Sequence, residues 1–320
     1  MKHVFVFDPR SFFDQEWKMD IVLENIGQYF RTQENVEFSI QYSKYRRNAI
    51  TIIQEEFENS NPGEAIRVYA IGSGGILFDC LNAVAHFPNM QLAVIPFGVS
   101  NDFLRIFGSE NLKLFRDVQA IAKAETLPTD IIRWGVNYAL NSCHIGIDTA
   151  LLKKKKAIKL NPNKSIFNVF SKISSSIKYF LSAFDKKSIQ QKYKVTIDDE
   201  EHSDQYSLIH IANGPYFSGR ITGAKDATPD DGLLDIVLIK SSGPLRTLAS
   251  IRKFSRGKKP KKSIFVQAKK ISIQSDQKML IQLDNEYIED TKINLNIIHN
   301  AVHLVVVNKL SYPIPSILAE

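Results

Sequence analysis

The sequence contains little cysteine, and this excludes two kinds of site. Cys80 and Cys143 are the only cysteines among 320 residues. Two cysteines so far apart form neither a disulfide framework nor a cysteine-based zinc site, so the composition favours a reducing compartment. The seven histidines also lack metal-ligand spacing. We expect both cysteines to be small buried apolar residues.

Long apolar runs are missing as well. The N-terminal MKHVFVFDP resembles a strand ending in a turn rather than a signal peptide. No later stretch approaches the roughly 20 apolar residues of a membrane-spanning helix. We therefore expect a cytoplasmic protein. The hydrophobic share of 44% indicates an ordinary globular core.

Acidic residues are outnumbered, with 41 Lys and Arg against 34 Asp and Glu, a net charge of +7. This balance favours an anionic partner: nucleotide, nucleic acid or membrane surface. Between Leu151 and Lys192 there are eleven lysines and one acid, Asp185, with apolar residues at helical spacing. A basic amphipathic helix can lie on anionic lipid, so we expect peripheral membrane association. The alternative is a core-packed helix with a solvated lysine face.

The pattern of predicted secondary structure changes near residue 127. Strand and helix patterns alternate before it, which predicts an α/β domain with a parallel sheet and ligands at the carboxyl ends of its strands. Many short strands follow, which predicts an antiparallel sandwich or barrel. We expect domains at 1–127 and 128–307, and a tail at 308–320 that returns to the first domain.

A glycine-rich turn follows the apolar run AIRVYA in IGSGGILFDCLN, residues 71 to 82. Turns of this kind between a strand and a helix commonly bind phosphate, because free backbone N–H groups and a helix N-terminus favour negative charge. This turn nevertheless has no lysine, carboxylate or threonine. Taken alone it is a weak signal, since such turns are more often structural.

A second stretch, IPFGVSNDFLRIFG, sharpens the interpretation. The sequence resembles the diacylglycerol kinase, sphingosine kinase and bacterial lipid kinase family, which carries a GGDGT loop and a PxGTGNDFAR segment. The matching residues are Pro96, Gly98, Asn101, Asp102, Phe103 and Arg105. NAD kinases share the GGDGT loop but lack the second segment, so they are the weaker alternative.

Further motifs follow in the family's order. They are Ile145–Asp148 (GxGFDA), Asn213–Gly214 with Gly219 (NGxxxGGG), Asp226–Asp235 (PDAxxDDGxLD), Arg256–Lys258 (RGKH) and Leu283–Glu286 (DGE). The resemblance implies a Rossmann-like α/β nucleotide domain with a parallel sheet, followed by an antiparallel β-sandwich domain that closes the cleft.

The departures from the family pattern concern the phosphate-facing positions. Gly74 stands at the aspartate of GGDGT and Ile76 at its threonine, Phe12 replaces a glycine of NPxSG, and Val99 and Ser100 replace the TG of GTGND. The residues left for nucleotide binding are Asp8, Ser11, Gly72, Ser73, Gly74, Gly75, Gly98, Asn101 and Asp102. A metal-binding carboxylate would have to be Asp8 or Asp102, or be absent.

The residues expected to face the phosphoryl acceptor match the family motifs more closely. The resemblance places Asp284 and Glu286 where a carboxylate takes the proton of the lipid hydroxyl. It also implies a structural Mg²⁺ held by Thr228, Asp231 and the carbonyl of Leu233. The alternative for Asp284 and Glu286 is a solvated acidic pair in a turn, and the alternative for Asp231 is a capping or turn aspartate.

The implied function is an ATP-dependent lipid kinase that uses ATP and Mg²⁺ and phosphorylates a diacylglycerol-like hydroxyl. The alternative is a catalytically inactive pseudokinase that binds lipid or nucleotide. A nucleic-acid-binding module fits the charge but not the motifs. The sequence leaves open which lipid is the acceptor and whether the protein forms a homodimer.

Overall fold

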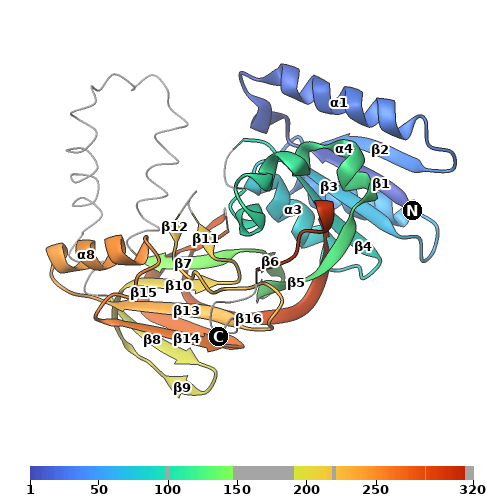
Figure 1. Ribbon diagram of the computed structural model, residues 1–320. Helices are drawn as coiled ribbons and strands as arrows, with labels where there is room; N and C mark the ends of the chain where they lie inside the picture. The colour runs from blue at the N-terminus through green and yellow to red at the C-terminus, as the bar shows by residue number, and fades with distance from the viewer. Residues whose placement is uncertain (99–100, 147–190, 218–220, 285, 314–320) are drawn as a thin grey trace.

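The computed structural model describes residues 1–98, 101–146, 191–217, 221–284 and 286–313 (Figure 1). Most of the lysine-rich segment that follows Leu151 lies outside the described residues, as do Val99, Ser100 and Gly219. The membrane association expected for that segment therefore stays a prediction.

Four strands near the N-terminus pair in parallel in the order β4-β3-β1-β2. They are β1 (Lys2–Phe7), β2 (Glu37–Tyr42), β3 (Ile66–Gly72) and β4 (Met90–Pro96). The helices of this part are α1 (Glu16–Phe30), α2 (Asn48–Glu58), α3 (Gly74–Val84) and α4 (Val118–Lys123), with the 3₁₀ turns η1 (Pro9–Phe12), η2 (Phe103–Phe107) and η3 (Asn111–Arg116). Parallel pairing brings the carboxyl ends of these strands to one edge of the sheet.

The following strands pair mainly antiparallel. They are β5 (Glu125–Trp134), β6 (Asn137–Ala139), β7 (Ser142–Gly146), β8 (Lys192–Ile197), β9 (Glu200–Glu201), β10 (Asp204–Ala212), β11 (Tyr216–Phe217), β12 (Ile221–Thr222), β13 (Leu234–Lys240), β14 (Ser263–Ala268), β15 (Lys270–Leu283) and β16 (Glu286–Val306). Helix α8 (Pro244–Phe254) connects β13 to β14, and the 3₁₀ turn η5 (Val307–Lys309) follows β16.

Strand β16 joins the two parts of the chain. It pairs antiparallel with β15 near its start and with β5 further along, and its residues His303 and Leu304 pair in parallel with β4. All but β11 and β12 therefore belong to one 14-stranded sheet. Parallel pairing joins only β1–β4 and the short β16–β4 contact within the described residues, so the expected Rossmann-like sheet stays a prediction. The boundary expected after residue 127 lies inside β5.

Two large hydrophobic clusters form the core. The first packs α1–α4 on β1, β3 and β4, and it includes Val302–Val307 and Tyr312. The Tyr312 hydroxyl is hydrogen-bonded to Thr129 Oγ1 of β5 at 2.6 Å, and its ring stacks on Phe107 of η2 with the centroids 5.3 Å apart, so the described end of the chain contacts both parts. Cys80 and Cys143 are buried free thiols.

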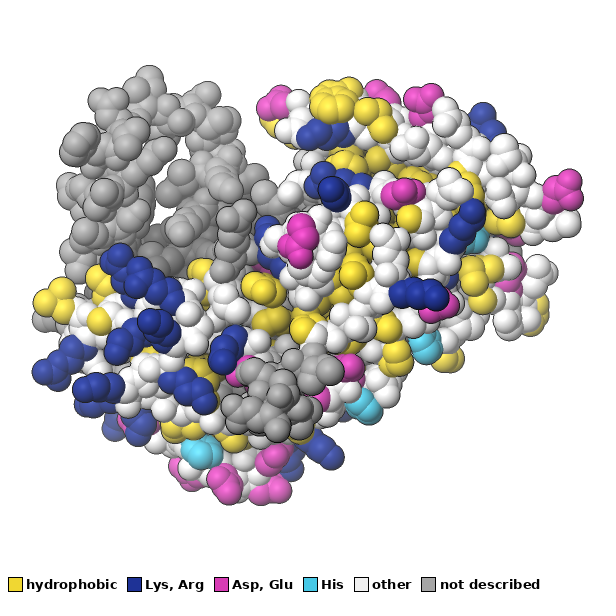
Figure 2. Space-filling model, in the orientation of Figure 1, with side chains coloured by type: hydrophobic (Ala, Val, Ile, Leu, Met, Phe, Trp, Pro, Cys, Tyr) yellow, Lys and Arg dark blue, Asp and Glu magenta, His cyan; other side chains and the backbone are white. Residues whose placement is uncertain are grey.

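No helix within the described ranges is long and apolar enough to cross a bilayer. In the space-filling view, Lys and Arg side chains gather over α8 and the strands beside it, at the lower left (Figure 2). The rest of this face carries mixed charges.

Candidate functional site

The loops after β1, β3 and β4 are hydrogen-bonded together at the carboxyl edge of the parallel strands. Ser73 N donates to Ser11 Oγ at 2.9 Å, which ties the first loop to the glycine turn. The carbonyl of Gly72 accepts from Phe97 N at 2.9 Å and from Asn101 Nδ2 at 3.2 Å. The expected nucleotide residues of three separate motifs are thereby brought to one place.

Close approach of these loops requires glycine at two positions. Gly72 has φ +145°, and a Cβ added there would lie 2.7 Å from Ser11 Oγ. Gly98 has φ +71° and lies beside the Ser11 backbone. Helix α3 begins at Gly74, and the first N–H groups of a helix have no intrahelical acceptor. This turn can therefore still offer backbone N–H groups to a phosphate.

Asp8 and Asp102 each interact with a nearby arginine. Asp8 caps η1: its Oδ1 accepts from Arg10 Nε at 2.7 Å, and its Oδ2 accepts from Ser11 Oγ at 3.2 Å. Asp102 lies 3.5 Å from Arg105 Nε. Neither arrangement presents a bare carboxylate to a metal ion.

A buried carboxylate that sequence reasoning missed lies five residues after Gly74. Asp79 Oδ2 accepts from Arg47 N at 2.8 Å, whereas its buried Oδ1 has no hydrogen-bond partner and lies 3.9 Å from Arg47 Nε. Burial raises the Asp79 pKa, while Arg47, Arg46 and Arg10 act to lower it. The signal available in the sequence was a single acid inside the apolar run ILFDCL.

Arg47 is held at this point by several contacts. Its backbone is left-handed, with φ +67°. Its guanidinium lies 4.6 Å from the Phe78 ring centroid and donates to Asn137 Oδ1 at 3.1 Å. Burial lowers the Arg47 pKa. Strained backbone conformations persist where the surroundings over-determine them, which is common at binding sites.

The β15–β16 turn faces this arginine loop. Glu286, the first residue of β16, forms an ion pair with the neighbouring Arg46. The Glu286 side chain is only 12% exposed, whereas that of Arg46 is 65% exposed. A carboxylate from the antiparallel part of the sheet therefore meets a cation from the parallel part.

Asp284 makes more hydrogen bonds to the backbone than Glu286, the other member of the expected acidic pair. Its carboxylate accepts from the backbone N–H groups of Leu140, Asn141 and Ser142 at 2.7, 3.0 and 2.9 Å. Its backbone has φ +48°. Burial raises the pKa of Asp284, although the three N–H donors oppose the shift. The carboxylate thereby anchors the β6–β7 connection.

The expected magnesium residues lie near the start of β13. Asp231 Oδ1 accepts from Leu233 N at 2.9 Å, and the Thr228 side chain also hydrogen-bonds to Asp231. Burial raises the pKa of Asp231. Over the described ranges, no group of three or more His, Cys, Asp or Glu residues is arranged to hold a metal. A site here would depend on carbonyl and hydroxyl oxygens, which suit Mg²⁺, and it stays a prediction.

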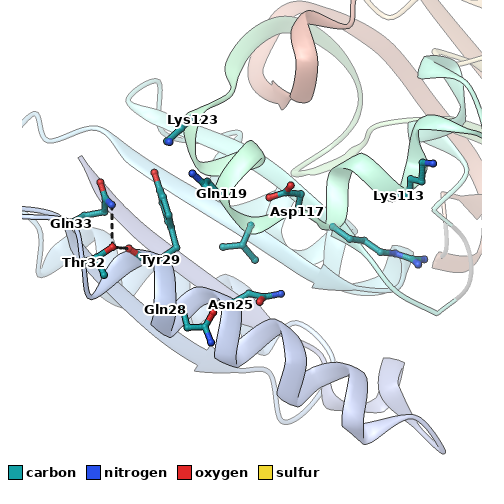
Figure 3. A pocket seen from close by; sticks show the side chains of 11 residues that line it. Asn25, Gln28, Tyr29, Thr32, Gln33, Lys113, Asp117, Gln119 and Lys123 are labelled. Carbon is teal, nitrogen blue, oxygen red and sulfur yellow. Dashed lines mark hydrogen bonds between the residues drawn. The ribbon is translucent and has the colours of Figure 1, made fainter.

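A separate open pocket of about 760 Å³ lies between α1 and the η3–α4 segment (Figure 3). It is lined by exposed polar side chains such as Gln28, Thr32 and Lys123, and it contains none of the expected site residues. Arg116 at its edge donates to the Pro96 carbonyl at 2.9 Å, which supports the loop that follows β4.

Two family models match successive parts of this chain. Residues 4–134 match the family model described as "Diacylglycerol kinase catalytic domain", and residues 163–306 match "YegS C-terminal NAD kinase beta sandwich-like domain". Two Staphylococcus aureus proteins, from strains Mu3 and Newman, are both named "Putative lipid kinase". Each is 27% identical over 277 residues, covering 85% of this chain and 87% of the relative.

A solved structure shares the fold. It is described as "a putative diacylglycerol kinase from Bacillus anthracis str. Sterne", with a TM-score of 0.70 and 21% identity. The similarity covers 97% of this chain and 98% of that one. The chain therefore belongs to the diacylglycerol kinase and bacterial lipid kinase family, with nucleotide-binding motifs that depart from the family pattern.

Proposed function

We propose that this protein transfers the γ-phosphate of ATP to the hydroxyl of a diacylglycerol-like lipid. The observation that carries the proposal is the contact of Glu286 with Arg46, because it brings an acceptor-side carboxylate to the arginine loop that contacts α3, the helix that begins at the glycine turn. In this reaction the lipid hydroxyl oxygen forms a bond to the γ-phosphorus. The bond from that phosphorus to the β,γ-bridging oxygen breaks, and ADP leaves.

The protein's own groups have separate tasks in this scheme. The N–H groups at the start of α3 and the side chains of Arg46 and Arg47 would hold phosphate oxygens. The hydroxyl proton would pass to Asp284 or Glu286. A bound Mg²⁺ would neutralise charge on the ATP phosphates. Arg46, Arg47 and Arg10 would neutralise phosphate charge that a metal held at the missing carboxylate of position 74 would otherwise neutralise.

A second candidate is a pseudokinase that binds nucleotide or lipid without turnover. Gly74 and Ile76 favour it, since neither side chain can bind a metal or a phosphate oxygen. The engagement of Asp8 with Arg10 and Ser11 favours it as well. The homodimer considered from the sequence is compatible with either function.

Two measurements separate the candidates. Titration calorimetry with ATP, with and without Mg²⁺, reports nucleotide binding. Transfer of radiolabelled γ-phosphate to diacylglycerol in mixed vesicles reports catalysis. A kinase binds ATP and labels the lipid; binding without labelled lipid identifies the pseudokinase, and the absence of both contradicts the proposed site.

A further inference from the structure

A dense positive surface lies on and beside α8. Residues 244–262, which we call the basic platform, contain eight cations and no acid. They are Arg246, Arg252, Lys253, Arg256, Lys258, Lys259, Lys261 and Lys262. No Asp or Glu occurs between Asp235 and Asp276. The platform alone thus carries more positive charge than the net +7 of the whole chain.

The platform cations face solvent. All eight are exposed, and within the described ranges none of them forms an ion pair. The Lys259 ammonium lies 5.2 Å from the Phe265 ring centroid. Figure 2 shows Lys and Arg side chains gathered over α8 and the neighbouring strands. Like charges gathered on one surface repel one another and attract an anionic partner.

The helix is fixed to the sheet and also presents an apolar side chain outward. Thr247 and Phe254 are buried, and Phe254 packs with Phe217 and Ile239. Leu245, in the first turn, is 81% exposed beside Arg246. The packed helix thus exposes a leucine among Lys and Arg side chains.

We propose that the basic platform docks on an anionic lipid bilayer and orients the protein there. Each Lys or Arg close to an anionic membrane adds to binding within a Debye length, and an exposed leucine on the same face can enter the interfacial layer. The inference rests on the proposed function only in that a lipid acceptor resides in a membrane. A nucleic acid would also neutralise the platform charge, but it offers no apolar layer that Leu245 could enter.

Sedimentation of the full-length protein with lipid vesicles tests this without ATP. Vesicles containing phosphatidylglycerol are compared with pure phosphatidylcholine. Replacing Lys258, Lys259, Lys261 and Lys262 by Gln should lower binding to the anionic vesicles about 600-fold, since each of the four charges contributes about fivefold. Leu245→Ser should lower it about fivefold, with the loss persisting in 1 M salt.

The matched control replaces four exposed lysines elsewhere, Lys113, Lys194, Lys278 and Lys292, by Gln. The control has the same net charge as the platform variant, and it should bind nearly as the unmodified protein does. The segment between residues 151 and 192 is unchanged in both. Equal losses in the two variants, equal binding to neutral vesicles, or tighter binding to single-stranded RNA than to vesicles would overturn the proposal.

The same variants separate this inference from the kinase proposal. Phosphorylation of a soluble short-chain diacylglycerol needs no membrane, so the platform variant should keep its turnover on that substrate. Vesicle binding by a protein without kinase activity would support the platform and reject only the proposed function.

Discussion

Arg46 in the loop before α2 forms an ion pair with Glu286 at the start of β16. The two residues are far apart in sequence, and they come from the parallel and antiparallel parts of the sheet. Arg46 is largely exposed, so the pair adds at most about 1 kcal/mol to stability. Its importance is positional, because it holds a carboxylate next to the arginines around Asp79.

Glu286→Gln keeps the shape of this side chain and removes its charge. If Glu286 accepts the hydroxyl proton, turnover should fall about 10²–10⁴-fold while ATP affinity barely changes. Steady-state kinetics with diacylglycerol in mixed micelles and calorimetry with ATP measure the two quantities. The matched variant Arg46→Ala leaves the carboxylate in place and removes a proposed phosphate contact, so its ATP affinity should weaken while its turnover falls less than that of Glu286→Gln. Unchanged turnover in Glu286→Gln would remove this residue from catalysis.

Asp284→Asn should affect both stability and turnover. An asparagine amide can replace only one of the carboxylate oxygens, so its NH₂ would face a backbone N–H of the Leu140–Ser142 segment. Each unsatisfied buried donor costs about 1–3 kcal/mol. Urea unfolding should therefore show a loss of that order, and kinetics on the folded fraction would report catalysis. A variant as stable as the unmodified protein would contradict the anchoring role.

The fold followed from the sequence in its order of elements, but not in how they join. Many short strands were expected after residue 127, whereas β16 runs unbroken from Glu286 to Val306. Asn300 adopts a positive φ of 52°, yet it lies at a register shift within a single strand, β16. A β-bulge places an unpaired residue in a strand without ending it. Residue pattern alone does not distinguish that bulge from a turn.

The candidate site was only partly predictable for a similar reason. The glycine turn and the acidic pair are local motifs, and they can be read along the chain. The Arg47–Asp79 contact spans 32 positions and exists because α2 packs on α3. The partners of Asp284 are backbone groups about 140 positions away. Such contacts depend on tertiary packing, which no local pattern contains.

The glycine turn should limit nucleotide affinity. Changing Gly74→Asp together with Ile76→Thr restores the family's carboxylate and hydroxyl. Because charge-assisted hydrogen bonds contribute about 1.5–3 kcal/mol, Mg²⁺-ATP should bind about tenfold or more tightly. Calorimetry of the double variant measures this, with Ile76→Val as a control that adds no polar group. An unchanged affinity would count against the alignment of this loop.

Mg²⁺ should stabilise the protein if Thr228, Asp231 and the Leu233 carbonyl hold the expected ion. Binding to the folded state at 100 times the dissociation constant adds about 2.7 kcal/mol. The melting temperature should rise with Mg²⁺ and fall again with a chelator, and Asp231→Asn should abolish the rise. Asp226→Asn is the control. An equal rise in the Asp231→Asn variant would place any bound ion elsewhere.

Stability should fall in mild acid because of a buried histidine in the first strand. His3 Nδ1 is 2.7 Å from the Tyr69 hydroxyl, and His3 is only 6% exposed. Burial lowers the pKa of His3 to about 4, and the nearby Arg67 acts in the same direction. Between its unfolded value near 6.5 and about 4, the unfolded chain binds more protons at this residue than the folded one.

The contribution of His3 to stability is therefore fully present above pH 6.5, and it is lost as the pH falls towards 4. The loss should be on the order of 3 kcal/mol, at 1.36 kcal/mol for each pKa unit. Urea unfolding at pH 7, 6, 5 and 4 measures it. His3→Gln can keep a hydrogen bond to Tyr69 but does not titrate, so its unfolding free energy should change less over this range. An identical pH dependence in that variant would assign the acid sensitivity to other groups, such as the buried His210, whose pKa burial also lowers.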